Sequence, residues 1–371
     1  MQMFLDECEY LIHLVRCTIH DLQPQELPEG LDFERVYGWG VYHHVANIAF
    51  YSVEKLALKP EAQLYGKWQA CRDRAIVLDI NQSYGAQQVR EAFAKGGVRY
   101  LEVQGTKVKP FYPQPSWRTM SDIDFIVEPQ KLSEAAHILE TLGYRCREER
   151  PGEVFAHYPP SINIELHTEY FMENYEYRKI LHSPFGSVDE NGQCGPETLY
   201  LYNIAHIAKH YFKGGCGIRR VLDVYFLNEK LGAVIDRSQI RRALEPVNGA
   251  QFYDELQSLA DAWFSKEGQS FPRTEMAAYI VNSGLHGNRP NELKHQLEKT
   301  FDNTLRFAKL RYFLRRFWGS GGQLRKKYPI LERHKILYPL CWLHRSFRAL
   351  QPQRFKRIRK EAEAVLKKNK A

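Results

Sequence analysis

The stretch Asp122–Val127, which reads Asp-Ile-Asp-Phe-Ile-Val, decides the fold class of this chain. Alternate side chains of a strand point to the same face, so the two acids share one face and the apolar residues share the other. The apolar face can pack against a core, which leaves Asp122 and Asp124 about 7 Å apart along the strand. Two carboxylates this close repel each other, and a hard divalent cation relieves that repulsion.

A third acid fits the same arrangement. The stretch Ile162–His167 alternates apolar and polar residues, which places Glu165 on a polar face with Asn163 and His167. If this strand lies beside the Asp122 strand, three carboxylates meet and can hold two metal ions for phosphoryl transfer. We expect His167 either at the edge of this site or as an ordinary hydrogen-bonded strand residue.

The neighbouring segments predict a small sheet covered by helices. A short strand covers Val98–Val103, and an amphipathic helix covers Lys131–Leu142 and ends at Gly143. Strand, strand, helix and strand within about 75 residues are typical of a compact sheet domain. The fold class is therefore α+β.

Four regions follow along the chain. Residues 1–95 are mainly helical and end with a helix over Ala86–Lys95, which Gly96 and Gly97 terminate. Residues 96–195 form the sheet core, 196–308 a second helical region, and 309–371 a basic, aromatic tail.

Composition limits the class of protein. Hydrophobic residues make up 44% and charged residues 26%, which is typical of a folded globular chain. The seven cysteines are scattered without a CxxC pair, so we expect neither a zinc site nor a disulfide framework. No apolar run approaches the length of a membrane span, and the first residues lack a secretory signal, so we expect a cytoplasmic protein without a membrane span.

Basic charge is concentrated at the C-terminal end. Residues 309–371 carry 19 Lys or Arg against three acids, whereas residues 1–308 carry 33 against 41. Basic residues interleaved with aromatic ones suit a nucleic acid or an anionic surface, and an acidic partner is a further possibility. The alternative is a helical extension whose charges lie in water.

Candidate phosphate contacts lie before Asp122. Gly105 and Thr106 follow the first strand, where glycine allows backbone N–H groups to approach an anion. Lys107 and Arg118 lie in the connection to Asp122 and carry the positive charge that a triphosphate needs.

Two histidines form a further candidate. His206 and His210 are spaced i, i+4 on an expected helix and share a face, so they serve structure or contact substrate more readily than they bind metal. Asp223 is a candidate acid for the N-terminal end of a helix or a candidate hydrogen-bond partner for these histidines. Arg219 and Arg220 either reach phosphates or lie in solvent.

Several blocks resemble the uncharacterised nucleotidyltransferase family of the polymerase β-like superfamily. They are Val103–Thr106, Tyr112–Val127, Leu142–Tyr144, Ile164–His167, His206–His210 and Arg219–Asp223. The resemblance covers roughly residues 85–230. It implies a small mixed nucleotidyltransferase sheet flanked by helical regions, Mg²⁺ or Mn²⁺ as cofactor, and a nucleoside triphosphate such as ATP as substrate.

The same resemblance implies roles for single residues. Asp122 and Asp124 would bind both metals, Glu165 would bind one and orient an acceptor hydroxyl, and Arg118 would contact the triphosphate. Gln104 replaces the usual lysine of the glycine turn, and Thr106 replaces a small Gly or Ser.

Three functions remain open on these residues. The first is transfer of a nucleoside monophosphate to an acceptor hydroxyl with release of pyrophosphate. The second is a catalytically degenerate module of the same fold that binds nucleotide or RNA. The third, a metal-dependent phosphohydrolase, is less favoured because the expected core carries few histidines.

Overall fold

The computed structural model describes residues 2–171, 176–181, 183–188, 194–268, 271–285 and 287. The chain forms two compact units, one of Met1–Tyr211 with Gly215–His286, the other of Phe212–Gly214 with Gly287–Ala371. The sheet and the contacts that position the candidate site belong to the first unit. The predicted basic tail 309–371 and the last part of the predicted helical region lie outside the described residues.

Helices precede the sheet, as the sequence predicts. They are α1 (Gln2–Ile19), α2 (Phe33–Tyr42), α3 (Ala46–Val53) and α4 (Ala62–Lys95). Helix α2 begins after Asp32, whose carboxylate accepts the Glu34 N–H at 2.8 Å and so satisfies a free donor of the first turn. Helix α4 ends at Gly96, and Gly97 follows with φ +66°, a conformation that favours glycine. The predicted helix Ala86–Lys95 is therefore the last part of a 34-residue helix.

The five strands form one mixed sheet in the order β1-β2-β5-β4-β3. Their bounds are β1 (Tyr100–Val103), β2 (Ile123–Val127), β3 (Arg145–Arg150), β4 (Glu153–Tyr158) and β5 (Ile162–His167). Strands β2 and β5 are parallel, and the other neighbouring pairs are antiparallel. The α+β fold with a small mixed sheet is confirmed.

The hairpin of β3 and β4 is absent from the sequence prediction. Strand β3 reads Arg-Cys-Arg-Glu-Glu-Arg and is almost wholly exposed at the sheet edge. Charged residues protect such an edge from pairing with other chains, and they also remove the alternation by which a strand is recognised.

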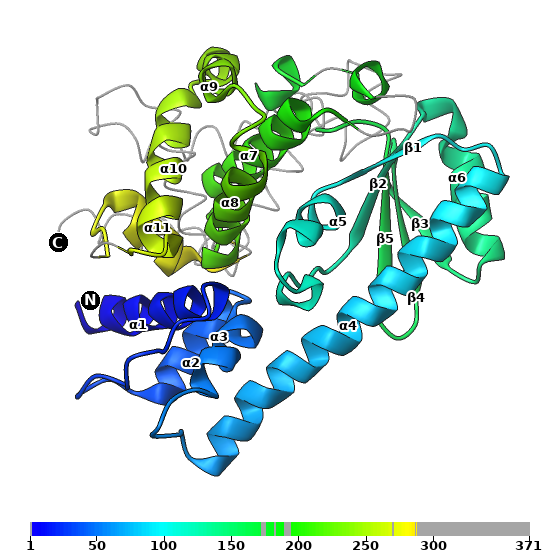
Figure 1. Cartoon of the computed structure of the whole chain (residues 1–371). Helices are drawn as coiled ribbons and strands as arrows, with labels where there is room; N and C mark the ends of the chain where they lie inside the picture. The colour runs from blue at the N-terminus through cyan, green and yellow to red at the C-terminus, as the bar shows by residue number, and fades with distance from the viewer. Residues whose placement is uncertain are drawn as a thin grey trace, which may run out of the picture. The chain divides into compact units, whose positions relative to one another are not determined.

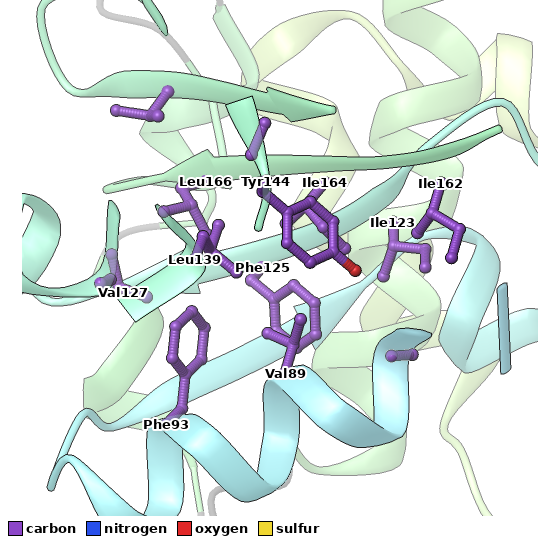
Figure 2. Close-up of a cluster of buried hydrophobic side chains, with 14 of the residues drawn as sticks. Val89, Phe93, Ile123, Phe125, Val127, Leu139, Tyr144, Ile162, Ile164 and Leu166 are labelled. Atoms are coloured by element: carbon purple, nitrogen blue, oxygen red, sulfur yellow. The ribbon is translucent and has the colours of Figure 1, made fainter. Parts of the chain in front are cut away.

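The core lies between one face of the sheet and the helices α4 and α6 (Leu132–Thr141). Figure 2 shows Val89 and Phe93 of α4 and Leu139 of α6 against the apolar residues of β2 and β5. The rings of Phe93 and Phe125 meet edge to face, with centroids 5.7 Å apart. Because this face of the sheet is buried, the alternate residues Asp124 and Glu165 point to the opposite side.

Helices also follow the sheet. They are α7 (Pro196–Phe212), α8 (Ile218–Leu231), α9 (Arg237–Leu244), α10 (Ala250–Phe264) and α11 (Glu275–Ser283). Helix α8 packs against α10 (Figure 1), and the Tyr200 hydroxyl of α7 donates to Oδ1 of Asn228 on α8 at 2.6 Å. The buried His43 joins this group to the N-terminal helices, because its Nδ1 accepts the Ile218 N–H at 3.2 Å and its Nε2 donates to the Val281 carbonyl at 3.1 Å. Burial lowers the pKa of His43 to about 3, which favours this neutral form.

Among the described helices, none is both long enough and apolar enough to cross a bilayer.

Candidate metal and phosphate site

Two of the predicted carboxylates lie side by side. Strands β2 and β5 are parallel neighbours, and their register pairs Asp124 directly with Glu165. The side chain of Asp124 is 5% exposed and that of Glu165 is 36% exposed. The site therefore has one carboxylate within the protein and one open to solvent.

Asp122 lies one residue before β2, because the strand begins at Ile123 rather than at Asp122 as the sequence predicts. Its side chain is half-buried. Burial first, and then the negative charges of Asp124 and Glu165, raise the pKa of Asp122 to about 7. The three acids therefore lie within electrostatic reach of one another, as a cation site requires.

His167 completes the cluster. Its Nε2 lies 3.1 Å from Oδ1 of Asp124 and 3.4 Å from Oε2 of Glu165, and its Nδ1 lies 3.8 Å from Oε1 of Glu153. Burial alone would lower the pKa of His167, but hydrogen bonds with these three carboxylates raise it well above its usual value. In the protein without metal, a protonated His167 therefore neutralises part of the acidic cluster.

The donor set fits a divalent cation. Asp124, Glu165 and His167 each offer one ligand atom, and these atoms lie within 4.8 Å of one another. Carboxylate oxygens suit Mg²⁺ and Mn²⁺, and an imidazole nitrogen is accepted more readily by Mn²⁺ than by Mg²⁺. From the sequence, His167 was expected either at the edge of the site or as an ordinary hydrogen-bonded strand residue, and its i+2 spacing from Glu165 is the signal that places it on the same face.

The turn after β1 approaches the acids through a side chain. Nε2 of Gln104 donates to Oδ1 of Asp124 at 3.0 Å, from a residue with φ 57° and ψ −124°. Gly105 begins the four-residue helix α5 (Gly105–Val108), and a Cβ at this glycine would lie 2.2 Å from Sδ of Met120. The absence of a side chain at Gly105 therefore makes room for Met120, a requirement that the sequence interpretation did not foresee.

The neighbours of Gly105 differ in what they contact. The hydroxyl of Thr106 donates to the Val103 carbonyl at 3.1 Å and so closes the turn. Lys107 is half-buried on the same short helix. Lys109 is buried and forms a 2.6 Å ion pair with Asp79 of α4.

Arg118 is buried in an ion pair. Its Nε and Nη2 donate to the two carboxylate oxygens of Asp223 at 3.0 and 2.8 Å, and the Tyr112 hydroxyl donates to the same carboxylate at 2.7 Å. Asp223 was expected as a partner for the histidines of α7, but its carboxylate binds Arg118 and Tyr112. The structure therefore places Arg118 in a structural contact between the β1–β2 connection and α8.

The two predicted histidines contact each other. Nε2 of His206 and Nε2 of His210 lie 2.9 Å apart, and the Tyr202 ring stacks on His206 at a centroid distance of 5.9 Å. Burial and the nearby charge of Lys209 lower the pKa of His206 well below its usual value. Among the described residues, the candidate metal cluster includes His167 but neither His206 nor His210.

A family model described as "Uncharacterised nucleotidyltransferase" matches residues 29–265, which is more than half of the chain. A solution structure of the antibiotic-resistance factor ANT(2'')-Ia shares 17% identity and covers 48% of this chain and 97% of that one, with a TM-score of 0.35. A likeness this low supports no argument about the site. No curated protein matches the chain.

Proposed function

The chain belongs to the uncharacterised nucleotidyltransferase family, and from this membership we propose that it transfers a nucleoside monophosphate from a nucleoside triphosphate to an acceptor hydroxyl. The observation that carries the proposal is the register of β2 with β5, which aligns Asp124 with Glu165 beside Asp122. Clustered carboxylates of this kind serve phosphoryl transfer by holding divalent cations.

Asp122, Asp124 and Glu165 would hold Mg²⁺ or Mn²⁺. When bound, the cation neutralises the carboxylates and acts as a Lewis acid toward phosphate oxygens. The fit rests on the close donor atoms of Asp124, Glu165 and His167 and on the raised pKa of Asp122, which reflects burial first and then the repulsion that a cation would relieve. His167 would lose its proton or its contacts when a cation binds, because the imidazole and the cation would contact the same carboxylate oxygens of Asp124 and Glu165.

The reaction forms one bond and breaks one. The acceptor oxygen bonds to the α-phosphorus, the bond between that phosphorus and the oxygen bridging to the β-phosphate breaks, and pyrophosphate leaves. Glu165, the more exposed carboxylate of the aligned pair, orients the acceptor hydroxyl and accepts its proton. Asp124, held by Gln104 and His167, keeps the cluster in a fixed geometry.

The nucleotide contacts are a separate part of the proposal. Lys107 is the strongest candidate among those expected from sequence, because α5 follows directly after Gln104, which binds Asp124. Gly105 and Thr106 would shape the turn, and the one remaining nitrogen of Arg118, Nη1, would be its contact with phosphate. His206 and His210 of α7 would line the part of the site that binds the nucleotide.

The test uses the full chain, Mg²⁺ or Mn²⁺, labelled nucleoside triphosphates and a panel of hydroxyl acceptors, with pyrophosphate release as the readout. Asp124→Asn is expected to abolish transfer, whereas the control Glu255→Gln, at an exposed position of α10, is expected to retain it. Release of inorganic phosphate without pyrophosphate, or transfer that survives Asp124→Asn, would contradict the proposal.

A second candidate is a degenerate module of the same fold that binds nucleotide without chemistry. Gln104 favours it, because an amide stands where the family turn carries lysine and occupies an oxygen of Asp124. Calorimetry with ATP separates the two functions. Affinity that ignores Mg²⁺ and survives Asp122→Asn favours the binding module, and affinity that depends on both favours the enzyme.

A further inference from the structure

Arg219 and Arg220 are adjacent on α8 but have different surroundings. Arg219 is buried, and its Nη1 donates to the Thr119 carbonyl at 2.5 Å and lies 3.1 Å from the Thr119 hydroxyl. The side chain of Arg220 forms no hydrogen bond or ion pair within the part of the chain that the structure describes, and its Nε, like that of Arg219, is buried without a partner. The sequence left open whether these arginines reach phosphates. In the structure, the Arg219 side chain has a protein partner and the Arg220 side chain has none among the described residues.

The position of Arg220 follows from the residues around it on α8. Arg219 binds Thr119 and Asp223 binds Arg118, so the same turns of α8 hold the segment that ends at Asp122. Asp122 and Arg220 also affect each other electrostatically: Arg220 counters the rise in the pKa of Asp122 that burial causes. Arg220 therefore lies within reach of the carboxylate cluster without forming an ion pair with it.

Lys209 adds a second cation from α7. Burial first, and then the charge of Arg220, lower the pKa of Lys209 to about 8, although Asp124, Glu165 and Glu153 act in the opposite direction. Lys209 therefore interacts electrostatically with Arg220 and with the carboxylates of the cluster. Two cations that are only partly exposed to water and lie within each other's electrostatic reach repel each other, and an anion between them offsets this cost.

We propose that Arg220, with Lys209, forms the subsite for the terminal phosphates of the nucleoside triphosphate. The guanidinium supplies several N–H donors in a planar fork that matches phosphate oxygens, and the lysine supplies a point charge. This subsite rests on the proposed nucleotidyl transfer, because the adjacent carboxylates would hold the metal that faces the α-phosphate. It also moves the main phosphate cation from the expected Arg118, which Asp223 binds, to Arg220.

The first experiment measures binding of inorganic tripolyphosphate to the full chain by calorimetry, in EDTA, so that no metal site contributes. Arg220→Gln is expected to weaken binding about 10- to 100-fold, since one charge-assisted phosphate contact is lost. Lys209→Met is expected to weaken it similarly, and Arg220→Lys should restore part of the affinity. Arg242→Gln, at an exposed arginine of α9, is the matched control and should bind like the wild type.

Thermal melting of the same proteins without ligand distinguishes a binding role from a structural one. Because the Nε of Arg220 is buried without a partner, Arg220→Gln should melt at or above the wild-type temperature. Unchanged tripolyphosphate affinity in Arg220→Gln, or a clear loss of melting temperature without loss of affinity, would overturn the proposal. Stronger dependence on Arg220 for a single-stranded RNA than for tripolyphosphate would also overturn it.

The outcomes separate this subsite from the proposed chemistry. If the wild type transfers no nucleotide but binds tripolyphosphate through Arg220, the proposed function fails and the subsite stands. If Asp124→Asn abolishes transfer while Arg220→Gln binds tripolyphosphate normally, the function stands and the subsite fails.

Discussion

Arg118 and Asp223 form a buried bidentate ion pair, with distances of 3.0 and 2.8 Å, that joins the β1–β2 connection to α8. Both side chains are almost fully excluded from water, and the Tyr112 hydroxyl binds the same carboxylate. Arg118 lies four residues before Asp122. The pair therefore fixes where the first acid of the candidate site stands relative to the helices that carry Lys209 and Arg220.

Removal of one partner of this pair should destabilise the protein strongly. Asp223→Asn leaves a buried guanidinium without its counter-charge, and the expected loss is about 3–5 kcal/mol in the free energy of unfolding. Urea denaturation measures this loss. The control is Arg241→Gln, which breaks an exposed pair with Asp254 and should cost less than about 1 kcal/mol. Similar losses for the two variants would show that burial does not determine how much the Arg118–Asp223 pair contributes to the free energy of unfolding.

Replacement of Asp124 should remove metal binding. Asp124→Asn keeps the size of the side chain but deletes the charge shared by the cluster, so Mn²⁺ affinity is expected to fall at least about 100-fold. Titration followed by electron paramagnetic resonance of free Mn²⁺ reports the affinity directly. Glu148→Gln, on the exposed edge strand β3, should bind Mn²⁺ like the wild type. Retained affinity in Asp124→Asn would place the cation elsewhere.

Asp122 should make stability depend on pH. Its pKa is raised from 3.8 to about 7 in the folded protein, so the folded state binds more protons than the unfolded state between these values. Stability is therefore lost as the pH rises through this window. Asp122→Asn should remove that loss and, in EDTA, gain about 1–2 kcal/mol over the wild type at pH 8, after a discount for partial exposure.

The same comparison at other conditions provides the control. The advantage of Asp122→Asn should shrink toward pH 5, where the native carboxyl is mostly protonated. Excess Mg²⁺ at pH 8 should reverse the order, because only the wild type gains stability from a bound cation. A pH-independent difference measured by chemical denaturation would contradict the assignment.

Gln104 combines an unfavourable backbone conformation with a useful side chain. Its φ of 57° and ψ of −124° suit glycine, and its amide binds Asp124. Both Gln104→Gly and Gln104→Ala lose the hydrogen bond, but only glycine relieves the strain. We therefore expect the glycine variant to be more stable than the alanine variant by about 1 kcal/mol. Thermal unfolding of the two proteins measures the difference, and greater stability of the alanine variant would refute the argument.

Much of the sheet could be predicted because its strands alternate. Strand β5 has the bounds Ile162–His167 that the sequence predicts, and β2 differs by one residue. Strand β3 could not be predicted, because it lies at an edge where charged residues hide the pattern. The long helix α4 was only partly predicted, since its apolar face packs on the sheet over the last third alone.

The acids could be predicted and their partners could not. The spacing of Asp122, Asp124 and Glu165 on two alternating stretches is local information, and it indicated a shared face. The partner of Arg118 could not be predicted in this way. A basic residue before an acidic motif has the same local sequence pattern whether its side chain binds a phosphate or a carboxylate of α8.

By itself, the sequence determined the fold class, the faces of the central strands and the acids that those faces carry, because side-chain alternation depends only on the local backbone. Only the tertiary structure decided that β2 and β5 are parallel neighbours, that Asp223 binds Arg118, and that Arg220 stands near the acids without a partner. These relationships join residues about 40 to 100 positions apart. They arise from the packing of α7 and α8 in the same unit as the sheet, and no local pattern encodes that packing.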